Sequence, residues 1–106
     1  MTDSLRAALL GDGPSELGGQ AVLVQNGEAR LSDGTLAGST LTMDQALRNL
    51  VKIGLPISEA SQRLSQFPAD YLGLEERGRL QPGSFADCVR LDRSLHLTDV
   101  MVEGET

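Results

Sequence analysis

The sequence predicts a mixed fold in which strands and helices occupy separate stretches of the chain. Two short β-prone runs flank the turn signal Asn26-Gly27, helical periodicity follows from Met43 onward, and apolar residues alternate again after Leu80. Alternation with a period of two indicates strands, whereas a period of 3.6 indicates helices. Taken alone, the chain is therefore expected to have an α+β fold.

The first 41 residues are expected to hold one hairpin between two loops. The predicted strands are residues 21–24 and 29–31, and Asn26-Gly27 suits a type I′ turn because both central residues need positive φ. Residues 32–41 carry many small side chains and are interpreted as a loop. Residues 1–19 are interpreted as another loop because five residues interrupt regular structure: Gly11, Gly13, Pro14, Gly18 and Gly19.

Three helices are expected next. The first lies between Thr42 and Gly54, because Thr42 and Gln45 form a capping-box pattern and Gly54 supplies a left-handed C-terminal cap. The second is predicted over residues 59–66 and the third over residues 68–72. The first helix carries an apolar face, made of Met43, Ala46, Leu47, Leu50 and Val51.

The last quarter of the chain is predicted to form two strands, residues 86–91 and 95–103. The apolar alternation of the second strand slips by one residue between Leu97 and Val100. A slip of one residue moves the side chains to the other face of a sheet, so we expect a β-bulge near Thr98-Asp99.

Composition limits the classes of function. The net charge is −6 and the nine Lys and Arg residues are scattered, which argues against non-specific nucleic-acid binding. The first ten residues resemble neither a signal peptide nor a membrane span, so a cytoplasmic location is expected. Aromatic residues make up only 3% of the chain and glycines number 12, so any core of a chain this short is small.

Few residues of the chain suggest catalysis by their type and spacing. His96 is the single histidine and has no partner at metal-ligand spacing, so a surface or strand-packing role is expected. Glu75-Glu76 adjoins arginines and is interpreted as a solvated surface. Cys88, the single cysteine, is expected to be a small buried strand residue rather than a reactive thiol.

The stretch from Gly34 to Ser39 is the exception. Its small residues leave backbone amides accessible just before a helix N-terminus, where a polar or anionic ligand can bind. An ordinary glycine-containing loop has the same pattern. The residues alone therefore leave both interpretations open.

A longer pattern favours the binding-site interpretation by resemblance. The segment from Asp33 to Met43 reads Asp-Gly-Thr-Leu-Ala-Gly-Ser-Thr-Leu-Thr-Met and resembles a motif of the N-acetylglucosamine-6-phosphate deacetylases, which are metal-dependent amidohydrolases. Further elements resemble this family in the same order along the chain: Thr2-Asp3, Leu17-Gly18-Gly19, the Asn26-Gly27 hairpin and Arg48-Asn49. The segment from Gly78 to Asp87 and Gly104 resemble the C-terminal end of the wider amidohydrolase superfamily.

The resemblance implies an α/β architecture, a (β/α)₈ barrel with a β-sandwich built from both chain ends. Residues 1–78 would be the C-terminal part of the catalytic barrel, with its last strand end, the hairpin and the closing helices. Residues 79–106 would be the C-terminal strands of the small β-sandwich domain.

The resemblance also implies an activity, the hydrolysis of N-acetylglucosamine 6-phosphate to glucosamine 6-phosphate and acetate. A divalent metal such as Zn²⁺ would activate water, and Asp3 would be the catalytic carboxylate that passes the proton to the leaving amine. Leu36, Ala37 and Gly38 would belong to the loop that contacts the substrate. The metal ligands of the family have no counterpart here, so no metal ligand is assigned.

The chain is therefore expected to be a C-terminal fragment of such a deacetylase, inactive alone, that forms a homo-oligomer or associates with the missing barrel portion. The alternative is a non-catalytic interaction module or partner subunit derived from an amidohydrolase. No membrane partner is expected.

Overall fold

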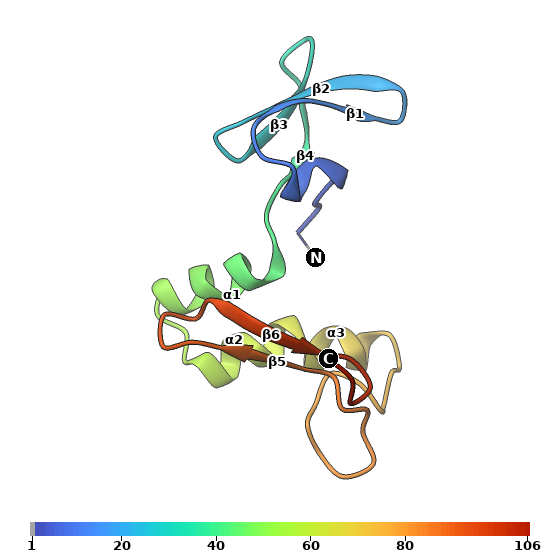
Figure 1. Cartoon of the computed structure of the whole chain (residues 1–106), viewed down its shortest axis with the longest axis vertical. Helices are drawn as coiled ribbons and strands as arrows, with labels where there is room; N and C mark the ends of the chain where they lie inside the picture. The colour runs from blue at the N-terminus through green and yellow to red at the C-terminus, as the bar shows by residue number, and fades with distance from the viewer. Residues whose placement is uncertain (1) are drawn as a thin grey trace. The chain divides into compact units, whose positions relative to one another are not determined.

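The computed structural model describes residues 2–106 and divides into two compact units, Met1–Ala46 and Leu47–Thr106. The first unit is mainly β, and the second combines helices with a hairpin (Figure 1). A mixed arrangement of this kind agrees with the expectation from periodicity.

The first unit is a four-stranded antiparallel sheet in the order β1-β2-β3-β4. The hairpin predicted around Asn26-Gly27 is confirmed, since β2 (Gln20–Gln25) and β3 (Glu28–Leu31) pair with Gln25 opposite Glu28. Asn26 and Gly27 have φ of 52° and 78°, as a type I′ turn requires.

The other two strands were not predicted, and the interpretation of residues 1–19 and 32–41 as loops is wrong over β1 (Gly13–Leu17) and β4 (Leu36–Ser39). Both lie at an edge of the sheet, where a proline such as Pro14 is tolerated. Gly18 and Gly19, with φ of 56° and 83°, form the tight turn that joins β1 to β2. These glycines therefore connect two strands instead of preventing them.

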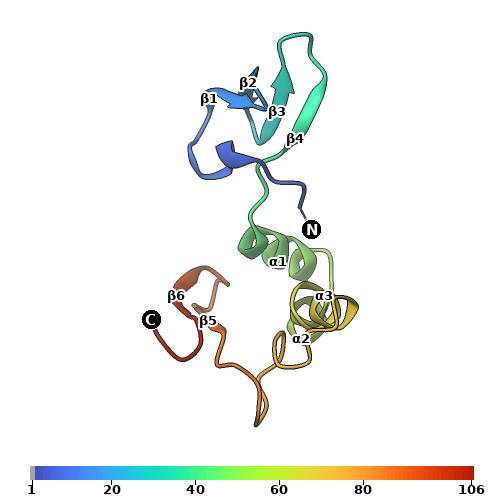
Figure 2. The same cartoon turned by 90° about the vertical axis from the view of Figure 1, so that its right-hand side faces the viewer.

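A short 3₁₀ helix, η1 (Arg6–Leu9), lies beside the sheet and closes its core (Figure 2). The buried residues are Ala7 from η1, Val22 and Val24 from β2, and Ala29 from β3. Val22 and Val24 alternate with Leu23, which is 54% exposed, because successive side chains of a strand point to opposite faces. The core of this unit therefore consists of small side chains.

The second unit begins within α1 (Met43–Lys52), which confirms the first predicted helix. Its end is a Schellman motif, because the amide of Leu55 donates to the Leu50 carbonyl (3.1 Å) and that of Gly54 donates to Val51 (3.0 Å). Gly54 has φ of 115°, so the predicted glycine cap is confirmed. Of the apolar face, Leu47 is buried and Met43 is 43% exposed.

The other two helices, α2 (Ile57–Leu64) and α3 (Gln66–Tyr71), each begin two residues before the predicted start. Pro68 falls in the first turn of α3, where backbone amides have no helical acceptor, so its missing N–H costs nothing there. No helix of residues 2–106 has the length and hydropathy needed to cross a lipid bilayer.

The chain ends with the antiparallel hairpin of β5 (Cys88–Leu91) and β6 (Leu97–Met101). Arg90 faces Asp99 while Leu91 faces Leu97, which leaves Thr98 as the extra residue. The predicted bulge near Thr98-Asp99 is therefore confirmed.

Candidate active site

Two segments that the sequence analysis singled out lie side by side in the first unit. Ser4 forms a parallel bridge with Ser39 at the end of β4. The amide of Ser39 donates to the Asp3 carbonyl (2.9 Å), and the amide of Leu5 donates to the Ser39 carbonyl (3.1 Å). The fold thus brings Asp3 next to the Leu36–Ser39 strand, although they are far apart in sequence.

The side chain of Ser39 adds a contact on the other side of Asp3. Its Oγ donates to the carbonyl of Thr2 at 2.5 Å and accepts from the amide of Leu41 at 3.1 Å. Ser39 is half-buried, so these hydrogen bonds are partly shielded from water. Sequence reasoning included Ser39 in the motif but not among the candidate site residues.

Gly38 is buried against the same segment. A Cβ atom at this position would lie 3.1 Å from the Asp3 carbonyl oxygen and 3.1 Å from Cδ2 of Leu5. Its φ of 159° is also one that residues with side chains rarely adopt, so both this backbone conformation and the close approach of the Asp3 backbone favour glycine here.

Asp3 itself is exposed and has φ of 54°. Aspartate is among the few non-glycine residues that enter the left-handed region, and such residues concentrate at functional sites. An exposed carboxylate on a backbone fixed by hydrogen bonds is able to exchange a proton with a bound molecule.

The two remaining candidates of the β4 loop differ in exposure. Leu36 is 59% exposed, whereas Ala37 packs against the small core. Leu36 therefore presents its side chain to solvent, while Ala37 and Gly38 offer mainly backbone groups.

An open hollow of about 390 Å³ adjoins the end of β4. Four of its seven lining residues carry a hydroxyl or carboxamide group, which can form hydrogen bonds with a ligand. The lining residues are Ala8, Gly27, Ser39, Thr40, Leu41, Thr42 and Gln45.

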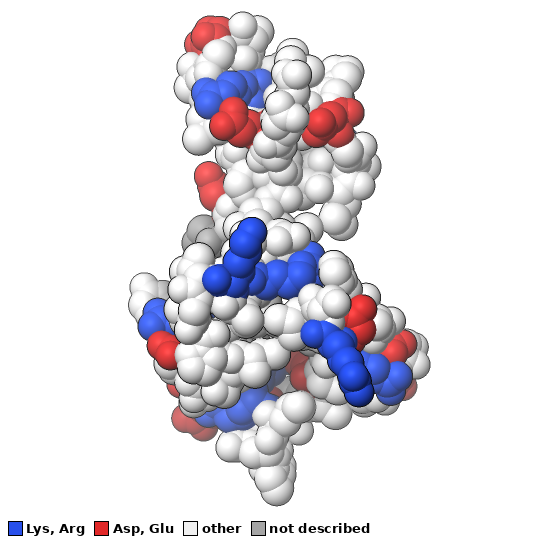
Figure 3. All heavy atoms as spheres, turned by 90° about the vertical axis from the view of Figure 1, so that its left-hand side faces the viewer, with Lys and Arg blue, Asp and Glu red and all other residues white. Residues whose placement is uncertain are grey.

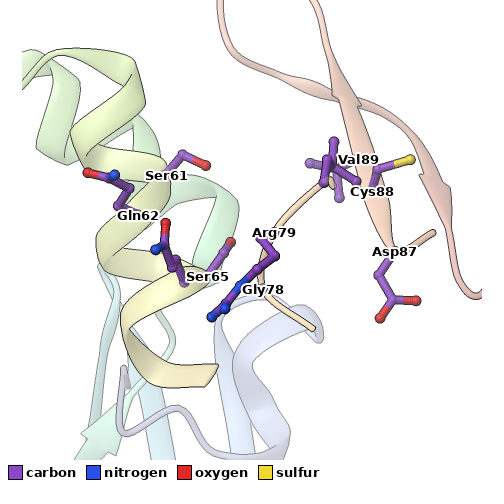
Figure 4. Close-up of a pocket in the computed structure, with 10 residues that line it drawn as sticks. Ser61, Gln62, Ser65, Gly78, Arg79, Asp87, Cys88 and Val89 are labelled. Atoms are coloured by element: carbon purple, nitrogen blue, oxygen red, sulfur yellow. The ribbon is translucent and has the colours of Figure 1, made fainter. Parts of the chain in front are cut away.

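A wider hollow of about 590 Å³ lies in the second unit, between α2 and β5 (Figure 4). Its wall includes Ser61 from α2, Ser65 between α2 and α3, Arg79, and Asp87 and Cys88 at β5. Cys88 is half-buried, so the strand position predicted for it is confirmed and full burial is not. The two charged residues in this wall are already engaged, as the following contacts show.

Asp87 belongs to a cluster that ties the chain end to the middle of the unit. Arg77 donates to Asp87 at 2.5 Å and to Glu103 at 2.6 Å, and its guanidinium lies 4.2 Å from the centre of the Phe85 ring. The backbone amide of Glu103, followed by Arg77, lowers the pKa of Asp87 below its ordinary value. Arg79 pairs with Asp70 in the same way. Both aspartates thus hold the unit together rather than serve a ligand.

The other titratable residues lie apart from Asp3. His96 is exposed in the β5–β6 turn, where its amide donates to Asp92 at 2.9 Å, and Glu75 and Glu76 are exposed as expected. Exposed ion pairs join Arg63 to Glu59 (2.9 Å) and Arg90 to Asp99 (3.0 Å), and Figure 3 shows several basic side chains next to acidic ones. Within residues 2–106, no three His, Cys, Asp or Glu side chains gather as metal ligands.

Comparison with known proteins places this geometry in context. No family model matches the chain. Two Escherichia coli relatives are each 39% identical over 107 residues, or 99% of the chain, and the second is named N-acetylgalactosamine-6-phosphate deacetylase. The N-acetylglucosamine-6-phosphate deacetylase of Lysinibacillus sphaericus is 41% identical over 98% of the chain.

Comparison with solved structures finds the same class of enzyme. The N-acetylglucosamine-6-phosphate deacetylase of Thermotoga maritima matches with a TM-score of 0.90 and 45% identity over 99% of this chain and 29% of its own. The Mycobacterium smegmatis enzyme, an aspartate-to-alanine mutant in complex with N-acetyl-D-glucosamine-6-phosphate, has a TM-score of 0.85 and 39% identity over 99% of this chain and 29% of its own.

The chain spans only part of these proteins. It covers 64% of the first Escherichia coli relative, 28% of the second and 27% of the Lysinibacillus protein. Sequence identity and three-dimensional similarity nevertheless extend along 99% of the chain. The chain therefore belongs to the N-acetylglucosamine-6-phosphate deacetylase family and corresponds to the C-terminal portion of its members.

Proposed function

We propose that this chain supplies the C-terminal part of the active site of an enzyme that removes the acetyl group from an N-acetylated amino-sugar phosphate. Asp3 is the catalytic carboxylate, and Leu36, Ala37 and Gly38 contact the sugar. The observation that carries the proposal is the pairing of Asp3 with Gly38 and Ser39, because a catalytic carboxylate and a substrate loop must lie within reach of one substrate.

In this proposal Asp3 acts as a general acid and base. Its carboxylate accepts a proton from the attacking water and donates it to the amine nitrogen as the C–N bond of the amide breaks, which releases acetate. Its exposure supports this role, since the group must reach a molecule that is not part of the protein.

The metal ion expected of the complete enzyme does not fit residues 2–106 by themselves. A catalytic Zn²⁺ takes about three protein ligands, and no cluster of three suitable side chains exists in this described range. Its ligands would have to come from outside this chain, so no step is assigned here to a metal.

The architecture is proposed on the same basis. Residues 1–78 would complete a (β/α)₈ catalytic barrel and residues 79–106 would add strands to a small β-sandwich. The large share of exposed apolar side chains supports a surface that binds a partner, either the remaining barrel or a second copy of the chain.

A cytoplasmic location is proposed from the substrate. A phosphorylated sugar is charged and does not cross a membrane unaided, so the enzyme that acts on it is expected where the sugar is held.

The substrate is proposed to be N-acetylglucosamine 6-phosphate, because the Mycobacterium complex contains it and its structure resembles this chain. The name of the Escherichia coli relative makes N-acetylgalactosamine 6-phosphate the second candidate. The two sugars differ only in the orientation of one hydroxyl group.

A chimaera tests the proposal. This chain would replace the corresponding C-terminal segment of the Thermotoga maritima relative, and acetate release would be measured with each sugar phosphate. Turnover by the chimaera but not by the chain alone is expected. A folded chimaera that binds the sugar phosphate but releases no acetate would favour the alternative, in which the chain is a non-catalytic module.

A further inference from the structure

We propose that Ser39 is a positioning residue that holds the backbone of Asp3 and so sets the direction of its Cα–Cβ bond, a role that rests on the proposed function of Asp3. The inference comes from the two peptide groups on either side of the Asp3 Cα atom, each of which is bound by Ser39.

The first peptide group carries the carbonyl of Thr2. The Ser39 hydroxyl donates to this carbonyl at 2.5 Å. The orientation of this peptide group relative to the Asp3 Cα atom is described by the φ angle of Asp3, so the hydroxyl restrains φ near its observed 54°.

The second peptide group carries the carbonyl of Asp3 itself. The backbone amide of Ser39 donates to it at 2.9 Å, and the bond from the Leu5 amide to the Ser39 carbonyl continues the pairing at 3.1 Å. This peptide group determines the ψ angle of Asp3. With φ and ψ both fixed, the direction of the Cα–Cβ bond is fixed as well, so the carboxylate is left only the rotations about χ1 and χ2.

The Ser39 hydroxyl is itself oriented. The amide of Leu41 donates to Ser39 Oγ at 3.1 Å, which occupies a lone pair and leaves the hydroxyl proton for Thr2. Ser39 is donor or acceptor in each of these bonds, and a left-handed aspartate has to be held in place by its surroundings. A threonine at position 39 would keep the hydroxyl, whereas an alanine would keep only the backbone bonds.

Five variants of the chimaera, with Asp3→Asn among them, test this role. Ser39→Ala is expected to lower kcat by roughly 10- to 100-fold with little change in KM, because a displacement of a reacting group near 1 Å costs about 100-fold. Ser39→Thr should recover most of kcat. Ser15→Ala, a serine in β1 at the opposite edge of the sheet, is the matched control and should leave both constants unchanged.

A double variant separates positioning from general stability. If Ser39 acts through Asp3, the double variant Asp3→Asn with Ser39→Ala should be no slower than Asp3→Asn alone, since the two residues act as a unit. Rate losses that multiply, or a Ser39→Ala loss that lies in KM, would overturn the role of Ser39 while leaving Asp3 as the catalytic residue. An unchanged kcat in Asp3→Asn would overturn the proposed function itself.

Amide exchange in the 106-residue chain gives a readout that needs no activity. Ser39→Ala is expected to speed exchange at Leu41, which loses its acceptor, and at position 39, whose amide donates to the less restrained Asp3 carbonyl. Unchanged exchange at both positions would contradict the restraint on Asp3.

Discussion

Replacement of Gly38 by alanine tests how tightly the two segments of the site approach each other. The added Cβ would meet the Asp3 carbonyl oxygen at 3.1 Å and Leu5 Cδ2 at 3.1 Å, so one or both neighbours must move by a few tenths of an ångström. The hydrogen bond between the Ser39 amide and the Asp3 carbonyl, now 2.9 Å, would be stretched toward the upper end of its normal range of about 3.2 Å.

Overpacking of this kind costs roughly 1–3 kcal/mol, which corresponds to about 5- to 150-fold faster amide exchange through local opening. The assay is hydrogen exchange of the Leu5 and Ser39 amides in the 106-residue chain, compared at one pH and one protein concentration. The φ of Gly38, 159°, is one that residues with side chains rarely adopt, so backbone strain adds to the effect of the contact.

A second substitution identifies the atom responsible. Leu5→Val removes the contact with Cδ2 but not the contact with the Asp3 carbonyl, so the double variant should recover only part of the protection, measured against Leu5→Val alone. If the Leu5 and Ser39 amides exchange equally fast in Gly38→Ala and in the parent, the close contact at Gly38 is refuted. If the double variant recovers full protection, the clash involves Leu5 only.

Three further predictions concern the chain as a whole. The isolated chain should release no acetate from N-acetylglucosamine 6-phosphate above a no-enzyme control and should bind no stoichiometric Zn²⁺; chelator-sensitive turnover would contradict this. It should self-associate, because side chains such as Ile53 (75% exposed) and Tyr71 (90% exposed) lie in water; a monomeric mass with a thermal transition that is independent of concentration would count against this. The unit Leu47–Thr106 should lose stability in acid, since hydrogen bonds from backbone amides hold the pKa of Asp87 and Asp92 below the unfolded value near 3.9. Stabilisation from a lowered carboxylate pKa is present at neutral pH and is lost as the pH falls below about 4, so the unfolding temperature should drop there, and less so in Asp87→Asn; a flat profile would be inconsistent with these bonds.

Local signals in the sequence predicted the elements whose chemistry is contained in a few adjacent residues. Asn26-Gly27 determined the β2–β3 turn, Gly54 the end of α1, and the phase slip between Leu97 and Val100 the bulge in β6. In each case the physical requirement, positive φ or a change of face, is set within about four residues.

The elements that were missed depend on partners distant in sequence. β1 and β4 contain glycine, proline and few β-branched residues, and they form because β2 and β3 offer free edges. The same holds for the site. Resemblance identified Asp3 and Gly38 separately, but the hydrogen bonds from Ser39 to the backbone of Thr2 and Asp3 follow only from the pairing of both segments in space.

The most direct test of the account is the rate of the chimaera carrying Asp3→Asn. Asparagine has nearly the same shape and cannot shuttle the proton, so the fold and KM should be retained while kcat falls by roughly 10²–10⁴-fold. A kcat within a few-fold of the parent chimaera would show that Asp3 is not the proton shuttle and would contradict the proposed site.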